Sequence, residues 1–154
     1  MIQDRRFALI FRAVSLLFAI AGVLAMLGVF NGRFMPATLA FYTMLSNVLA
    51  IVLLGMLTVR TAAGLRGGRR GNVGYFARFE MICSVDILLT FFVFWVMLAP
   101  TIFTMTGDYS LWTFDNLAVH AITPLLCLLD YILFTQPRHL KYRDVYFVSI
   151  FPLS

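Results

Sequence analysis

Long stretches without a charged residue limit what this chain can fold into. Residues 13–32, 34–59 and 87–107 contain no Asp, Glu, Lys or Arg. A helix needs about 20 mostly apolar residues to cross a bilayer, and each stretch supplies them. Residues 112–135 form a fourth, with acids only at Asp115 and Asp130. We therefore predict an all-α, polytopic transmembrane helix bundle with spans near residues 8–30, 37–59, 76–99 and 112–135.

The composition excludes a water-soluble bundle of this size. Hydrophobic residues make up 62% of the 154-residue chain and charged residues 12%, which is too little polar surface to cover a soluble globule. The first apolar run is too long for a signal peptide, so we predict a retained anchor. From about residue 143 the segment VYFVSIFPLS begins like a fifth span. We predict that residues 1–154 are a single integral membrane domain that is truncated there.

Basic residues predict the orientation of the spans, because Lys and Arg are held on the cytoplasmic side. Among the spans and their flanks, only Arg33 falls on the opposite side from the other basic residues, which are Arg5, Arg6, Arg12, Arg60, Arg66, Arg69, Arg70, Arg78, Arg138, Lys141 and Arg143. This bias predicts a cytoplasmic N-terminus and cytoplasmic loops at residues 60–75 and 135–143. The loops at residues 31–36 and 100–111 would face outward.

Motifs for phosphate, nucleic acid or metal are missing from the sequence. The loop RTAAGLRGGRRGNVGY is basic and rich in glycine, yet it lacks the GxxxxGK[ST] spacing. Cys83 and Cys127 lie within spans, and neither belongs to a CxxC or Cys/His cluster. We therefore expect no nucleic-acid partner, no metal and no cofactor.

The fourth predicted span carries polar residues on one helix face. Asn116, His120, Thr123, Cys127 and Asp130 follow one another at spacings of four, three, four and three, which places them on a single stripe. Pro124 has no N–H, so the carbonyl of His120, four residues back, loses its helical hydrogen bond. We expect the helix to bend there. Polar residues inside a membrane usually face the protein interior and often mark a functional site.

The second and third spans carry matching polar residues. Thr43, Ser46 and Asn47 share one face of the second span, and the third span contributes Glu80, Cys83, Asp86 and Thr90. From the helical rise, Thr43 and His120 should each lie roughly 10–12 Å below the outer boundary, at the same level. Asp86 should lie near the midplane.

Structural roles are open for each of these residues. The hydroxyl of a transmembrane Thr usually bonds to the carbonyl four residues back, which for Thr43 is that of Leu39. Asp86 could orient an imidazole, bind a proton for transport, or pair with Arg78. Asp130 and Glu80 approach the cytoplasmic ends of their spans, where we expect them to pair with arginines of the loops.

Two patches, FYTMLSN in the second span and HAITPLLCLLDYILF in the fourth, resemble the bacterial proline-rich six-transmembrane family. That family is similar to the eukaryotic androgen-induced and androgen-dependent membrane proteins, which are transmembrane threonine hydrolases of fatty acid esters of hydroxy fatty acids. The resemblance implies a six-span fold, an essential Thr at Thr43 and an essential His at His120. It also implies a location in the bacterial inner (plasma) membrane.

The resemblance implies a lipid-ester hydrolase in which His120 takes the proton of Thr43 as the hydroxyl attacks the ester. Asn47 and Asn116 are the candidate oxyanion donors by face and depth, and Asp86 is a further candidate for support. The partners would be the bilayer, a lipid ester or fatty acyl substrate, and possible further copies of the chain. Two other functions stay open: a proton-coupled transporter using Asp86 and His120, and a non-catalytic membrane protein.

Overall fold

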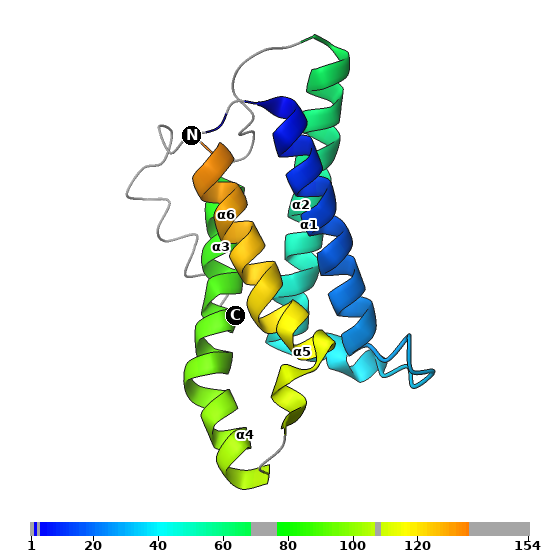
Figure 1. Cartoon of the computed structure of the whole chain (residues 1–154), viewed down its shortest axis with the longest axis vertical. Coiled ribbons are helices and arrows are strands. Elements are labelled where there is room, and N and C mark those ends of the chain that lie inside the picture. The colour runs from blue at the N-terminus through cyan, green and yellow to red at the C-terminus, as the bar shows by residue number, and fades with distance from the viewer. Residues whose placement is uncertain (1, 3, 69–76, 107–108, 136–154) are drawn as a thin grey trace.

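The computed structural model describes residues 2, 4–68, 77–106 and 109–135, and their long elements are all helical. The helices form four segments that run alternately up and down the bundle (Figure 1). The first is α1 (Arg5–Met26) and the second is α2 (Tyr42–Arg66). The third comprises α3 (Ala77–Phe92), η2 (Val93–Leu98) and α4 (Ala99–Thr106), and the fourth comprises α5 (Phe114–Leu117), η4 (Ala118–Ile122) and α6 (Thr123–Phe134).

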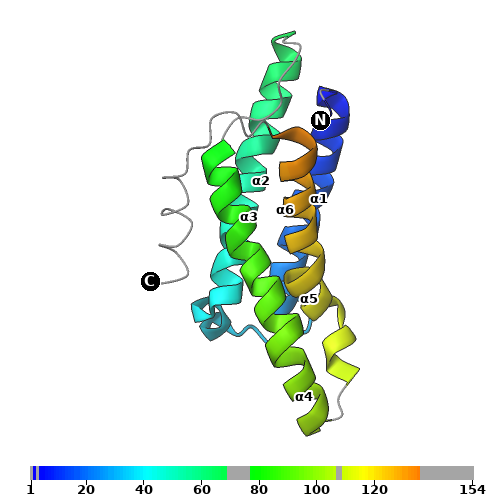
Figure 2. The ribbon, with the colours of Figure 1, turned by 90° about the vertical axis from the view of Figure 1, so that its left-hand side faces the viewer.

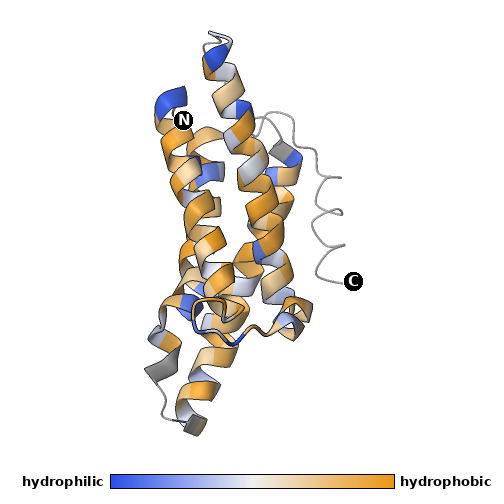
Figure 3. Cartoon of the chain, turned by 90° about the vertical axis from the view of Figure 1, so that its right-hand side faces the viewer, coloured by the Kyte–Doolittle hydropathy of each residue, from blue (hydrophilic) through white to orange (hydrophobic). Residues whose placement is uncertain are grey.

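Among the described residues, four helical segments are long and apolar enough to cross a membrane. They cover Arg5–Met26, Tyr42–Arg66, Arg78–Met105 and Phe114–Phe134. Figure 3 shows apolar residues over most of the length of these segments. The predicted fold class, an all-α multi-pass membrane bundle, is therefore confirmed for the described residues. The predicted fifth span, from about residue 143, lies outside them.

Helix α1 starts and ends a few residues earlier than predicted, and local geometry explains both ends. The carboxylate of Asp4 accepts hydrogen bonds from Arg6 N (2.8 Å) and Phe7 N (3.3 Å), which caps the helix. The helix is followed by Gly28, whose φ of +74° favours glycine. A Cβ atom at Gly28 would also lie 2.1 Å from the Arg33 carbonyl oxygen.

Helix α2 begins later and ends later than the predicted residues 37–59. Pro36–Ala40 forms a separate 3₁₀ turn, η1. The backbone at Phe41 is extended, so α2 starts at Tyr42. At the other end the helix continues to Arg66, because the segment after Arg60 is rich in helix-forming residues and its last turn carries a basic side chain that suits the helix dipole.

The third and fourth segments each contain a π-helical turn just before a proline. In η2, Ala99 N bonds to Phe94 O, and in η4, Thr123 N bonds to Ala118 O. Pro100 and Pro124 follow these turns directly. In a π turn each N–H bonds to the carbonyl five residues back and not four. This change in the bonding pattern comes directly before the proline, which has no N–H to donate. The third segment therefore continues to Thr106 and does not end at residue 99 as predicted.

Neighbouring segments pack α1 against α2 and α3 against α6 (Figures 1 and 2). Helix α1 also approaches η4 closely at Gly22, where a Cβ atom would lie 2.7 Å from the Cβ of Ala118. The described interior contains several clusters of buried apolar residues. One of them, which we call the Leu54 layer, consists of Ala19, Ala50, Leu54, Ile87 and Cys127.

A polar layer lies on each side of the Leu54 layer. This follows from the order of residues along α2, where Asn47 precedes Leu54 and Thr61 follows it. The His120 layer, toward the α1–α2 connection, contains Asn47, His120 and Thr123, all buried. The Arg12 layer, toward the N-terminus, contains Arg12, Thr61 and Asp130, also buried.

The expectation that Asp130 pairs with a loop arginine is wrong. Its partner is Arg12, which lies within α1 and is 0% exposed. The Arg12 guanidinium donates to Asp130 from Nε (2.8 Å) and Nη2 (3.1 Å), and to Thr61 Oγ1 from Nη1 (2.7 Å). Glu80 accepts the hydroxyl of Thr135 just after α6.

Candidate functional site

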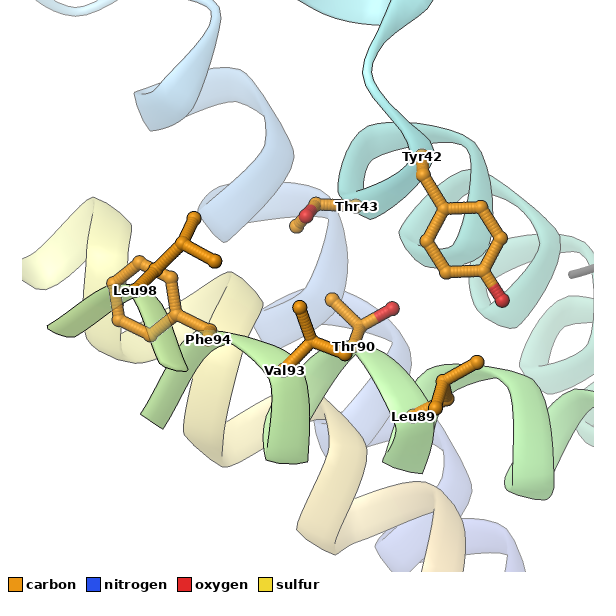
Figure 4. Close-up of a pocket in the computed structure, with 7 residues that line it drawn as sticks. All are labelled: Tyr42, Thr43, Leu89, Thr90, Val93, Phe94 and Leu98. Atoms are coloured by element: carbon orange, nitrogen blue, oxygen red, sulfur yellow. The ribbon is translucent and has the colours of Figure 1, made fainter. Parts of the chain in front are cut away.

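Thr43 lies in the first turn of α2, beside a pocket of about 250 Å³ between α2 and the third segment. Figure 4 shows its side chain directed toward the opposing residues of α3 and η2. The lining is mostly apolar and consists of Tyr42, Thr43, Leu89, Thr90, Val93, Phe94 and Leu98. Within the described residues Thr43 shows no bond from its hydroxyl to the Leu39 carbonyl. The hydroxyl is thus left facing the pocket.

His120 lies within the π turn η4 and is 5% exposed. Its imidazole stacks face to face on Phe94, with ring centroids 3.6 Å apart and an interplanar angle of 10°. Phe94 also lines the pocket beside Thr43. The Nδ1 atom of His120 has no hydrogen-bond partner among the residues that the structure describes.

The carbonyl of His120 has a partner outside its own helix. Trp95 Nε1 donates to it at 3.0 Å. Because Pro124 cannot donate to this carbonyl, the indole of the third segment supplies the missing hydrogen bond. A bend was predicted at Pro124; the structure has a π turn there, and the freed carbonyl of His120 joins the third and fourth segments.

Thr43 and His120 are brought near a common neighbour but not into direct hydrogen-bond contact. In the described part of the chain the Thr43 hydroxyl and the His120 ring share no hydrogen bond. Phe94 contacts both the pocket and the imidazole. Any proton transfer between the two residues would need a rearrangement around Phe94.

Asn47 holds α2 against the fourth segment at the level of His120. Its Nδ2 donates to Thr43 O (2.8 Å) and Val119 O (3.1 Å). Both amide hydrogens are therefore engaged, and in this arrangement Asn47 positions the backbone of Thr43 without offering a donor to an oxyanion. Asn116, the other predicted donor, lies half-buried in α5.

Asp86 is 1% exposed and takes a partner that the sequence did not indicate. The hydroxyl of Tyr42 donates to its Oδ1, while Oδ2 has no partner among the described residues. Pairing with Arg78, one of the three roles left open for Asp86, is not among the described contacts of this carboxylate. The sequence did not predict the hydrogen bond from Tyr42 to Asp86, because it depends on how α2 is rotated relative to α3. The one signal in the sequence was that Tyr42 directly precedes Thr43.

Hydroxyl groups also join α2 to α3 below the pocket. Ser46 Oγ and Thr90 Oγ1 are 2.9 Å apart, and Thr90 is one of the residues that line the pocket. Over the described ranges no group of three or more His, Cys, Asp or Glu side chains could hold a metal ion. Comparison with family models, curated proteins and solved structures finds no match to this chain.

Proposed function

We propose that this multi-pass membrane protein is an intramembrane lipid-ester hydrolase, in which Thr43 is the nucleophile and His120 the base. One observation carries the proposal: the Thr43 hydroxyl faces an apolar pocket, and one wall of that pocket, Phe94, lies on the His120 imidazole. The resemblance of the second and fourth spans to the bacterial proline-rich six-transmembrane family, which is similar to the threonine hydrolases, supports the same pair.

The pocket has the chemistry of a site for an acyl ester. Leu89, Val93, Phe94 and Leu98 supply apolar contacts, and burying each methylene of an acyl chain gains about 0.8 kcal/mol. Tyr42 and Thr90 also line the pocket, but their hydroxyls are bonded to Asp86 and Ser46, so the Thr43 hydroxyl is the group that could orient an ester. A bilayer lipid is therefore the class of substrate that this lining favours.

The proposed reaction has two steps. The Thr43 oxygen attacks the ester carbonyl carbon while its proton passes to a nitrogen of His120, and the alcohol then leaves with that proton. Water next attacks the acyl-threonine, giving the fatty acid and restoring the Thr43 hydroxyl. Such transfer requires about 3 Å between the two groups, a contact that often tightens only when substrate binds. We propose that substrate entry displaces Phe94 for this purpose.

The test is hydrolysis of fatty acid esters of hydroxy fatty acids by the purified chain in lipid nanodiscs. Thr43→Ala and His120→Gln should each lower kcat at least 100-fold, since general acid–base catalysis contributes roughly 10²–10⁴-fold. Thr58→Ala is the matched control, because Thr58 lies on the same helix and its hydroxyl bonds to Leu54 O (2.6 Å). Equal turnover in Thr43→Ala and Thr58→Ala would reject Thr43 as the nucleophile.

Proton-coupled transport is the competing proposal, and the unpartnered oxygen of buried Asp86 favours it. The Leu54 layer argues against it, because apolar side chains separate the His120 layer from the Arg12 layer. Transport predicts pH-dependent flux in liposomes that Asp86→Asn abolishes. If neither flux nor hydrolysis is measured, the polar layers serve only to hold the helices together.

A further inference from the structure

Three buried polar atoms lack a hydrogen-bond partner along the seam between α2 and the fourth segment. They are Asn47 Oδ1, His120 Nδ1 and Thr123 Oγ1, and no described residue bonds to them. Their side chains are 0%, 5% and 1% exposed, respectively. Leaving such an atom unpaired costs about 1–3 kcal/mol, so three in one layer require an explanation.

Thr123, like the buried Ser84, lacks the local hydrogen bond that several hydroxyl residues of these helices make. Four others donate to the carbonyl four residues back, at 2.6–2.9 Å: Ser15, Thr58, Thr61 and Thr101. For Thr123 that carbonyl is Val119 O, which accepts Asn47 Nδ2 at 3.1 Å. The π turn also directs Thr123 N to Ala118 O. The Thr123 hydroxyl makes no bond to this carbonyl or to any other described group.

The three atoms belong to one short stretch of the seam. Asn47 contacts Val119 O, His120 is the next residue, and Thr123 lies one turn further along the same segment. The neighbouring Leu54 layer contains only apolar side chains and a cysteine thiol, so it offers these atoms no strong hydrogen-bond partner. A small polar ligand between the helices would satisfy them together.

We propose that Asn47 Oδ1, His120 Nδ1 and Thr123 Oγ1 form a binding site for an internal water molecule. A buried water typically makes about three hydrogen bonds to otherwise unpaired polar groups. Here it donates one hydrogen to the Asn47 carbonyl and one to the imidazole nitrogen, and it accepts the hydroxyl of Thr123. The donors and acceptors of the three groups therefore match those of one water molecule.

The site also supplies the water molecule that hydrolysis consumes, an inference that rests on the proposed function. Phe94 stacks on His120 and lines the pocket beside Thr43. The water site and the pocket therefore share one aromatic wall. Displacing Phe94 brings this water toward the acyl-threonine, which it attacks with His120 as the base.

The first test is the sign of the stability change in Thr123→Val, which keeps the shape and removes the hydroxyl. If the hydroxyl binds water, the substitution breaks that bond and the unfolding temperature in detergent falls. If the hydroxyl is unpaired, its removal relieves a desolvation cost and the unfolding temperature rises, which would overturn the proposal. Thr61→Val is the control, since its hydroxyl bonds to Arg12 and to Leu57 O and its loss destabilises in either case.

The second test detects water beside the imidazole directly. In water-edited solid-state NMR, a His139→Gln protein with ¹⁵N-labelled histidine reports on His120 alone, because the chain has two histidines. Rapid polarisation of the ring from water protons is expected, and a ring that stays unpolarised would overturn the site. Thr43→Ala should keep this signal. A signal without hydrolysis would retain the water site and reject the proposed function. Hydrolysis without a signal would retain the proposed function and reject the water site.

Discussion

Arg12 shows how far a single residue can depart from what its position in the sequence suggests. The charge pattern places it in the cytoplasmic flank of the first span, yet it is 0% exposed inside the bundle. Its guanidinium bonds to Asp130 and Thr61, and it lies over the Phe134 ring at 5.2 Å from the centroid. These contacts join α1, α2 and α6 through one side chain.

Removing one member of this ion pair should be far more harmful than removing both. Asp130→Asn leaves Arg12 buried without its counter-charge, and we expect a loss of about 3–5 kcal/mol in the free energy of unfolding. In the double variant Arg12→Met and Asp130→Leu, most of that loss should be recovered, because no charge is left buried. Chemical unfolding in detergent micelles measures both.

Arg6→Met serves as the control, since Arg6 is on the same helix and exposed. It should change the unfolding free energy by no more than about 0.5 kcal/mol. A double variant as unstable as Asp130→Asn would show that the pair is not what holds the three helices.

At this scale the sequence predicted which residues face the interior but not what they contact. Spacing within a helix put His120 and Thr123 on one stripe, and both are buried. The stack of His120 on Phe94 and the bond from Tyr42 to Asp86 depend on how the helices rotate against each other. Neither spacing nor hydropathy within one helix contains that information.

Among the elements, the two proline-associated π turns mark the clearest departure from prediction. The third span was predicted to end at residue 99, directly before Pro100. The π turn η2 accommodates it, and the segment continues to Thr106. In the fourth segment η4 does the same for Pro124, with Trp95 bonding to the freed carbonyl of His120.

The role of Trp95 predicts a coupling between Trp95 and Pro124. Trp95→Phe removes the donor and leaves the His120 carbonyl unpaired, so it should cost about 1–3 kcal/mol of unfolding free energy. Pro124→Ala provides a backbone N–H that can bond to the same carbonyl. Trp95→Phe should therefore cost clearly less in the Pro124→Ala background, as a double-mutant cycle of unfolding free energies would measure.

Trp112→Phe gives the matched control for this cycle. Its indole contacts Trp95 at 5.7 Å between ring centroids, but it is an exposed residue. Its effect should be the same with either residue at position 124. Strict additivity of Trp95→Phe and Pro124→Ala would contradict the account of the π turn.

For the molecule as far as the structure describes it, hydropathy predicted four spans and their order, because crossing a bilayer imposes a length and a polarity on each one. It could not predict that the interior alternates between polar and apolar layers. That alternation arises from side chains of three or four separate helices meeting at one level, as Ala19, Ala50, Ile87 and Cys127 do.

The distribution of arginines predicts which loops face the cytoplasm, and cysteine labelling can test this because both native cysteines are buried. Cys83 and Cys127 are 2% and 3% exposed, so they should react little with a membrane-impermeant maleimide. A cysteine at Asn31, in the exposed α1–α2 connection, should be labelled in intact cells. One at Gly67, just after α2, should be labelled only after the membrane is opened. The reverse pattern would overturn the cytoplasmic N-terminus.

The central claim, that Thr43 is a nucleophile served by His120, is tested most directly by mapping a covalent adduct. Membranes holding the protein are treated with an alkyl fluorophosphonate, and the modified peptide is sequenced by mass spectrometry. The account predicts the adduct on Thr43, with labelling at least tenfold weaker in a folded His120→Gln variant. An adduct on another residue, or labelling that His120→Gln leaves unchanged, would contradict it.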